Sequence, residues 1–197
     1  MEHMRRASVH RKTRETDISI TLDLDGQGSW RSETGVPFMD HMLSLFAAHS
    51  MLDMEISAQG DTAVDDHHTV EDTGIVLGQA LASALGDRTG IVRYGSQLMP
   101  MDEALVLVSL DFSGRGLLVY DVPMPASRVG SFDTELVSEF LRALASHAGM
   151  TLHVQLMHGA NSHHIIEAVF KGFGRALRQA VSIDPRQQGV PSTKGTL

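Results

Sequence analysis

The sequence predicts an α+β protein made of two similar half-domains, because the 197-residue chain contains one pattern twice. Residues 67–85 read HHTVEDTGIVLGQALASAL, and residues 163–181 read HHIIEAVFKGFGRALRQAV. Both begin with two histidines, place a glutamate three residues after the second, and continue with apolar residues at helical spacing. Each follows a helical stretch that ends near a histidine and then a strand-like run. Two such units can bury their bare sheet faces against each other's helices.

The same elements are expected in the same order in both halves. The first half, about residues 15–90, is predicted to contain a strand at 17–24, a turn at 26–28, a second strand after the turn, a helix from Pro37 to about His49, a strand at 51–56 and, after a loop, a helix at 67–85. The second half, about residues 100–185, is predicted to contain a strand at 104–110, a turn at 113–116, a second strand after the turn, a helix from Asp133 to about His147, a strand at 151–156 and, after a loop, a helix at 163–181. Residues 86–100 are expected to connect the halves within one domain of residues 1–197, and residues 1–14 to form a solvated tail.

Composition narrows the classes of function. The 16 Lys and Arg against 24 Asp and Glu give a net charge of -8, which argues against nucleic-acid binding because that requires a basic face. An anionic small molecule stays open, since a few well-placed cations can reverse the sign locally. The chain has no cysteine, which fits a reducing compartment, and no apolar run approaches the ~20 residues that span a bilayer. We expect a cytoplasmic protein without nucleic-acid or membrane partners.

The duplicated His-His-x-x-Glu motif predicts a metal site. The first copy consists of His67, His68 and Glu71, and the second of His163, His164 and Glu167. Residues three or four apart share one face of a helix, so each glutamate can join one histidine while the other histidine points to a different site. Two retained copies count against a helix-capping role, which favours Ser, Thr, Asp or Asn. Imidazole and carboxylate ligands without thiolate suit Mn, Fe, Zn or Ni alike.

Alignment of the halves adds further candidates. Matching His49 with His147 places His41 opposite Glu139, and both of these side chains can bind metal. His49 and His147 are also consistent with imidazolium groups that complement the dipole at a helix end. From the acidic run at 61–66 we expect two carboxylates to support the ligand histidines: Asp65 and Asp66.

The chain resembles imidazoleglycerol-phosphate dehydratases over essentially its whole length. The matching stretches are RKTRET from Arg11, TGVPFMDHML from Thr34, DDHHTVED from Asp65, GDRTGIVRYG from Gly86, DFSGR from Asp111, NSHHIIEAVFKGFGRALRQA from Asn161 and PSTKG from Pro191. Their order and spacing are very specific. The resemblance implies the ribosomal protein S5 domain 2-like fold, a homo-oligomer of twenty-four subunits, and active sites between subunits that each hold two Mn ions.

The resemblance also implies two sets of metal ligands. One ion would bind His41, His68, His163 and Glu167, and the other His67, Glu71, His164 and Glu139. Relatives often carry histidine at the last position, and a glutamate there is an acceptable oxygen ligand for Mn, so we expect coordination to survive with altered affinity. Ligands pooled from neighbouring copies would make metal binding and oligomerisation depend on each other.

The implied activity is that of a carbon–oxygen lyase in L-histidine biosynthesis. It removes water from D-erythro-imidazoleglycerol 3-phosphate to give imidazole acetol phosphate. The carbon that loses its proton has no neighbouring carbonyl group, so the imidazole ring must supply electrons, through a metal-stabilised imidazolate and a diazafulvene-like intermediate. The catalytic candidates are the ligands Glu71 and Glu167, with Glu15 and His49 for substrate contact or proton transfer.

The phosphate requires cations despite the negative net charge. The resemblance assigns it to Arg93, Arg115, Lys171, Ser192 and Lys194. Arginine suits bidentate phosphate recognition, and serine adds a hydroxyl donor. Lys194 lies in a C-terminal tail, residues 186–197, whose Pro, Ser, Thr and Gly residues allow it to fold over a substrate.

Two other functions are open to a chain with these residues. A different dinuclear metallohydrolase would use its metals to generate hydroxide and would not need an imidazole substrate. A non-catalytic metal-binding assembly protein would show no phosphate-specific binding. A catalytic role predicts that loss of Lys171 or Arg115 abolishes turnover while the metal-bound oligomer persists.

Overall fold

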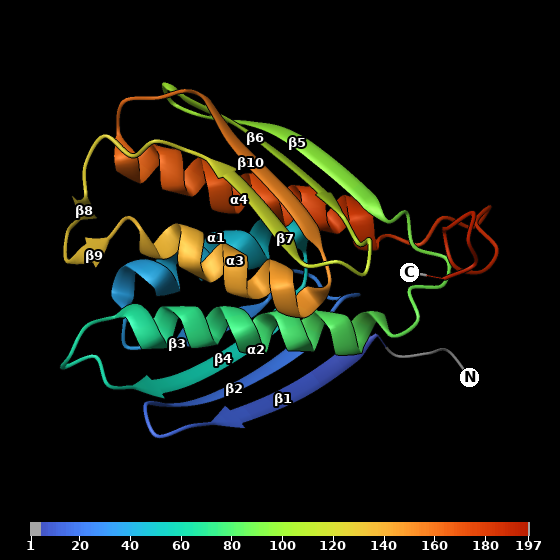
Figure 1. Cartoon of the computed structure of the whole chain (residues 1–197), viewed down its shortest axis with the longest axis horizontal. Helices are drawn as coiled ribbons and strands as arrows, with labels where there is room; N and C mark the ends of the chain where they lie inside the picture. The colour runs from blue at the N-terminus through green and yellow to red at the C-terminus, as the bar shows by residue number, and fades with distance from the viewer. Residues whose placement is uncertain (1–4, 197) are drawn as a thin grey trace.

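The computed structural model describes residues 5–196 and places four helices between two four-stranded sheets (Figure 1). The first half comprises β1 (Arg6–Lys12), β2 (Thr16–Asp23), β3 (Trp30–Glu33), α1 (Pro37–Ser50), β4 (Asp53–Gly60) and α2 (His67–Leu85). The second half comprises β5 (Tyr94–Met101), β6 (Ala104–Asp111), β7 (Leu117–Asp121), the hairpin of β8 (Arg128–Val129) and β9 (Phe132–Asp133), α3 (Leu136–Ala148), β10 (Thr151–His158) and α4 (Ser162–Val181).

The two sheets have equivalent topologies. The strand order is β1-β2-β4-β3 in one sheet and β5-β6-β10-β7 in the other. In each sheet the first three strands are antiparallel, and the last strand runs parallel to its neighbour. The α+β fold of duplicated β-α half-domains is therefore confirmed, and the β8–β9 hairpin is an addition in the second half.

The helices of the two halves exchange partners. Helix α1 packs against α4, and α2 packs against α3, so each pair combines one helix from each half. Glycines permit both close approaches. A Cβ atom at Gly174 of α4 would lie 2.7 Å from the carbonyl oxygen of Phe46 in α1, and one at Gly78 of α2 would lie 2.6 Å from that of Leu144 in α3. Because neither separation accommodates a side chain, these crossings depend on glycine.

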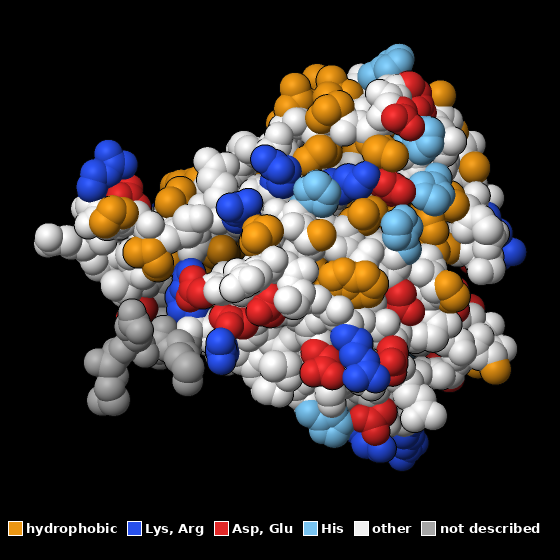
Figure 2. Space-filling view, turned by 180° about the vertical axis from the view of Figure 1, so that it is seen from behind, with side chains coloured by type: hydrophobic (Ala, Val, Ile, Leu, Met, Phe, Trp, Pro, Cys, Tyr) orange, Lys and Arg blue, Asp and Glu red, His pale blue; other side chains and the backbone are white. Residues whose placement is uncertain are grey.

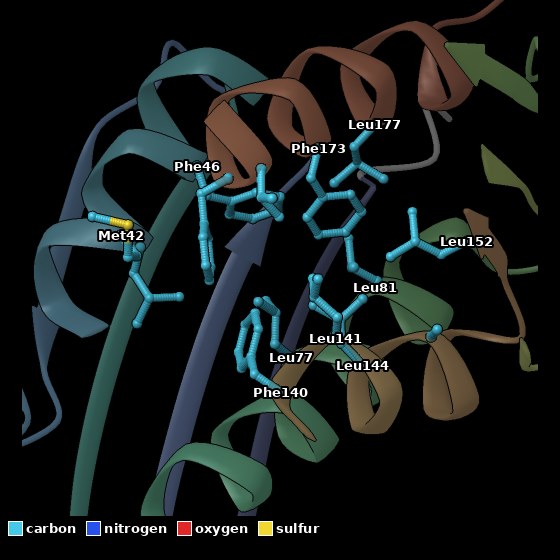
Figure 3. Packing of buried hydrophobic residues seen from close by; sticks show 14 of the residues in the cluster. Met42, Phe46, Leu77, Leu81, Phe140, Leu141, Leu144, Leu152, Phe173 and Leu177 are labelled. Atoms are coloured by element: carbon cyan, nitrogen blue, oxygen red, sulfur yellow. The ribbon is translucent and has the colours of Figure 1, made fainter. Parts of the chain in front are cut away.

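One hydrophobic core runs through both halves (Figure 3). Phe46 of α1 stacks on Phe173 of α4 with ring centroids 5.0 Å apart, and Phe140 of α3 stacks on Phe170 of α4 at 5.6 Å. Leu81 of α2 belongs to the same buried cluster. Aromatic pairs of this kind add about 0.5–1.5 kcal/mol each beyond area burial. The first contact stabilises the α1–α4 pair, and the second joins that pair to α3.

Besides the β8–β9 hairpin, two strands lie where the sequence predicts none. Part of the expected solvated tail forms β1, which pairs with β2 and is anchored by an ion pair between Arg11 and Asp72 of α2. Part of the expected connector forms β5, which pairs with β6 along its whole length. Strand β4 also begins at Asp53 rather than at the predicted Met51, because Met51 ends α1 in the left-handed conformation with a φ of 61°. The sequence missed β1 and β5 because their side chains are mostly polar or interrupted by Gly and Pro.

No helix between residues 5 and 196 combines the length and the apolar character that crossing a membrane requires.

Candidate functional site

The crossing of α1 and α4 brings three metal-binding side chains together. His41 of α1 places Nε2 3.3 Å from Oε1 of Glu167, and His163, one turn before Glu167 on α4, places Nε2 3.0 Å from the same oxygen. One ligand atom from each residue lies within 4.8 Å of the other two. Glu167 is only 8% exposed, whereas the two imidazoles reach solvent. Such a half-open group of two imidazoles and a carboxylate is compatible with metal binding.

Glu167 is charged despite its burial. Burial raises the pKa of this carboxyl group, but hydrogen bonds from Lys171, His41 and His163 outweigh that effect and lower the pKa to about 2. The ammonium group of Lys171 lies 2.6 Å from Oε2, while both imidazoles face Oε1. The carboxylate therefore divides its oxygens between a cationic side, at Oε2, and a histidine side, at Oε1.

The fourth residue expected in this set lies elsewhere. His68 donates Nδ1 to Asp61 at the end of β4, with a nitrogen–oxygen distance of 3.1 Å, and is outside the group of three. Asp61 raises the pKa of His68, with a smaller contribution from the charge of Glu15. The catalytic candidate Glu15 thus lies near the start of α2, in the turn between β1 and β2.

The residues expected at the second ion are spread over the surface of one subunit. His67 and Glu71 face each other along α2 at 3.5 Å. Glu139 of α3 instead accepts hydrogen bonds from Arg142 at 2.6 and 2.7 Å. His164 of α4 donates Nδ1 to Glu103 in the β5–β6 turn at 2.7 Å. Within one chain, therefore, only His67 and Glu71 of this set are in contact.

The acidic loop before α2 supports a histidine ring through a different residue than expected, because Asp61 rather than Asp65 or Asp66 contacts His68. The Asp65 side chain accepts a hydrogen bond from the backbone N–H of His67 at 2.9 Å. Asp66 precedes the helix without a side-chain capping bond, and burial together with the charges of Asp65 and Asp133 raises its pKa. The carboxylates that contact the second histidine of each motif are Asp61 and Glu103, and neither was among the expected site residues. Each is positioned by the end of a strand. Asp61 belongs to the acidic run at 61–66, and Glu103, like Glu15, directly precedes the second strand of its half.

Four of the five residues expected to bind phosphate line one pocket of about 900 Å³ at the C-terminal end of α4. They are Arg93, Arg115, Ser192 and Lys194. The Arg93 guanidinium pairs with Asp111 and donates to the carbonyl oxygen of Pro191 at 2.8 Å, so it holds the tail against the body of the subunit. Arg115 and Lys194 form no ion pair with any residue in the range 5–196.

Lys171 and His49 lie apart from that pocket. Lys171 contacts Glu167 at the histidine cluster. His49, in the last turn of α1, is close enough to Lys171 and Arg175 for their charges to matter: burial first, and then these two cations, lower the pKa of its imidazole. Figure 2 shows histidines gathered with basic and acidic side chains at one end of the molecule, while the C-terminal tail projects from the other end.

Comparison with known proteins identifies the family that the chain resembles in sequence and in fold. A model of the family described as "Imidazoleglycerol-phosphate dehydratase" matches residues 34–177. Curated dehydratases of that name from Desulforamulus reducens and Roseobacter denitrificans are 62% and 60% identical, covering 98% of this chain and 98% and 100% of theirs. The crystal structure of the Staphylococcus aureus enzyme is 44% identical with a TM-score of 0.83, covering 91% of this chain and 99% of that one. The Pyrococcus furiosus structure is 39% identical, also with a TM-score of 0.83, covering 96% and 100%.

Proposed function

The chain belongs to the imidazoleglycerol-phosphate dehydratase family, and from that premise we propose a manganese-dependent elimination carried out between subunits. The enzyme is accordingly a dehydratase of histidine biosynthesis. We propose that it converts D-erythro-imidazoleglycerol 3-phosphate into imidazole acetol phosphate, in the cytoplasm, with two Mn²⁺ ions per active site. The observation that carries the metal proposal is the convergence of His41, His163 and Glu167 from two helices.

The available donors suit manganese. Two imidazole nitrogens and one carboxylate oxygen converge, and no thiolate competes for a softer ion because the chain lacks cysteine. We assign His41, His163 and Glu167 to one ion, completed by His68. We assign the other ion to a second set: His67, Glu71, His164 and Glu139. The ions would supply Lewis-acid polarisation of the substrate and a template that orients it.

The distance between the histidine cluster and the pocket with the cations within one subunit supports a site shared between subunits. Val181 follows Glu167 by fourteen residue steps along α4, which is about 20 Å at 1.5 Å per residue. The pocket with the cations begins beyond that point, since the Arg93 backbone N–H bonds to the carbonyl oxygen of Ala180. A substrate with one imidazole ring and a three-carbon phosphate ester is too short to bridge this distance. The cations and the histidine cluster can therefore serve one substrate only if different subunits supply them. The resemblance in sequence supports an assembly of twenty-four.

Protein side chains have separate tasks in this proposal. Arg115, Lys194 and Ser192 bind the phosphate by charge-assisted hydrogen bonds, and Arg93 holds the tail that carries two of them. His49 and Glu15 are the proton-transfer candidates. Because the pKa of His49 lies below its ordinary value, its imidazole is neutral at pH 7 and can accept the proton from the middle carbon. Lys171 keeps Oε2 of Glu167 occupied, so that Oε1 alone faces the metal position.

The decisive experiment is turnover of imidazoleglycerol phosphate by chelator-stripped protein, with and without added Mn²⁺. We expect no activity in the stripped protein and recovery on adding Mn²⁺. The matched control is Glu167→Gln, which removes the ligand charge at constant shape. Absence of turnover from folded protein that has rebound metal would contradict the proposal and would favour a metallohydrolase or a metal-binding assembly protein.

A further inference from the structure

The two histidines of each doublet are held in different ways. The first histidine of each doublet, His67 or His163, directs Nε2 toward the glutamate one turn later on its own helix. The second, His68 or His164, uses Nδ1 to contact a carboxylate that comes from another element of the fold. The pattern is the same in both halves.

We propose that Glu103 and Asp61 are positioning residues that fix His164 and His68 as ligands through Nε2. The inference rests on the proposed function, because it assumes that these histidines bind metal. A neutral imidazole has one N–H and one lone pair, and an ionised carboxylate can only accept a hydrogen bond. A carboxylate at Nδ1 therefore requires the proton to sit there, which leaves the lone pair on Nε2.

Glu103 is fixed independently of any metal. Its Oε1 accepts the backbone N–H groups of Asn161 at 2.8 Å and Ala160 at 3.3 Å, and its Oε2 accepts Nδ1–H of His164 at 2.7 Å. The residue thus joins the β5–β6 turn to the loop that leads into α4. Both carboxylate oxygens are used, so the ring of His164 is held in one orientation before metal arrives.

Nε2 of His164 makes no hydrogen bond within residues 5–196. Oδ2 of Asp102 lies 3.7 Å from this nitrogen, which is beyond hydrogen-bonding distance. Asp102 itself is mostly exposed. The same residue has a φ of 46° at the first position of the two-residue turn, a conformation that glycine adopts more readily. The tight turn places Glu103 directly beside α4.

The two carboxylates come from different places in their halves but contact the same ring nitrogen. Asp61 follows β4 in the first half, whereas Glu103 precedes β6 in the second, so they are not equivalent positions of the repeat. Both nevertheless meet Nδ1 of the second histidine of a doublet. An exposed ion pair for stability alone would not need to choose this nitrogen in both halves.

The test is Glu103→Gln, with Glu55→Gln on the outer face of the first sheet as the matched control. The amide oxygen of the introduced side chain can still accept the backbone N–H groups of Ala160 and Asn161, but its amide nitrogen donates to Nδ1 of His164. That moves the ring proton to Nε2 and blocks the ligand atom. We expect one of the two Mn²⁺ ions per subunit to bind about 10- to 100-fold more weakly in equilibrium dialysis. In crystals soaked with Mn²⁺, the anomalous peak beside His164 should lose occupancy while the other peak is retained.

The Mn²⁺ affinities of Glu103→Gln decide whether Glu103 has a positioning role. If Glu103→Gln binds both ions as tightly as the wild type and the control, the positioning role is wrong. If both ions weaken together with the thermal stability, or if Nδ1 of His164 is the ligand atom in the wild type, it is also wrong. If the variant does not fold, the test passes to Asp61→Asn, which should weaken binding of the Mn²⁺ ion at His68. Unchanged affinity in that variant would likewise show that the positioning role is wrong. If the wild type binds no Mn²⁺ at His164 and shows no turnover, the proposed function itself fails.

Discussion

Replacing Gly174 with alanine tests whether the helix crossing sets the geometry of the metal cluster. The new Cβ would lie 2.7 Å from the carbonyl oxygen of Phe46, whereas ordinary contacts begin at 3.4 Å, so α1 must retreat by about 0.7 Å. Overpacking of this kind costs about 1–3 kcal/mol, and the better helix propensity of alanine returns about 1 kcal/mol. We expect net destabilisation of about 0–2 kcal/mol and a fall in Tm of at most about 8 °C.

The effect on metal binding should be larger than the effect on stability. His41 lies on α1 and its partners His163 and Glu167 lie on α4, so the retreat lengthens distances across the cluster. Metal–ligand distances tolerate only about 0.2 Å. Titration of the stripped protein with Mn²⁺ should show one ion per subunit bound at least about tenfold more weakly. Gly78→Ala creates the equivalent clash at α2 and α3 and should weaken the other ion. Affinities within about twofold of wild type for both ions in Gly174→Ala would refute the reasoning.

Three further predictions concern the remaining parts of the site and the fold. Arg115→Ala should lower kcat/KM for the phosphate substrate about 100-fold or more, with unchanged Mn²⁺ content, because two charge-assisted hydrogen bonds are lost; metal loss instead would contradict it. Glu139→His removes the pairing with Arg142 that competes with ligation, so dialysis should show Mn²⁺ bound up to about fivefold more tightly, the worth of an exposed ion pair. The backbone N–H groups of Gln27 and Ser29 donate to the Asp53 carboxylate and lower its pKa in the folded state below the ordinary value of 3.8. Asp53 therefore stabilises the fold fully above pH 3.8, and this stabilisation is lost as the pH falls through the pKa of the folded state. Asp53→Asn should therefore lower the Tm by a few degrees at pH 7, and the difference should shrink in acid; a pH-independent difference would count against this.

The sequence was sufficient for the fold because the repeat is carried by buried residues. The doubled motif and its apolar spacing identified α2 and α4, and the aligned halves identified α1, α3 and the inner strands. Strands β1 and β5 are edge strands of their sheets. Strand β1 alternates exposed with half-buried side chains, and β5 buries only Gly95 and Met99, so neither strand leaves a strong apolar signal. Edge strands of this kind are specified by their partners rather than by their own composition.

The site could be predicted only in part, for a physical reason. His41, His163 and Glu167 meet because two helices cross, and the alignment of the halves pointed to His41. The resemblance supplied the grouping of these three with His68, and within one subunit His68 lies elsewhere, beside Asp61. A spacing rule on one helix describes neighbours along that helix and says nothing about which subunit completes a ligand set. The contact between Glu103 and His164 likewise depends on a turn and a helix start that are far apart in the sequence.

The exchange of helix partners has a consequence for how two unlike sites can exist in one small chain. If two separate copies of a single half associated in this way, symmetry would make both helix crossings identical, down to the side chains beside each motif. Covalent linkage removes that restriction. One crossing now carries His41 and Lys171, while the equivalent positions at the other carry Glu139 and Ile75. A fused pair can therefore tune one cluster, for example its charge, without altering the other, which a symmetric dimer of halves cannot do.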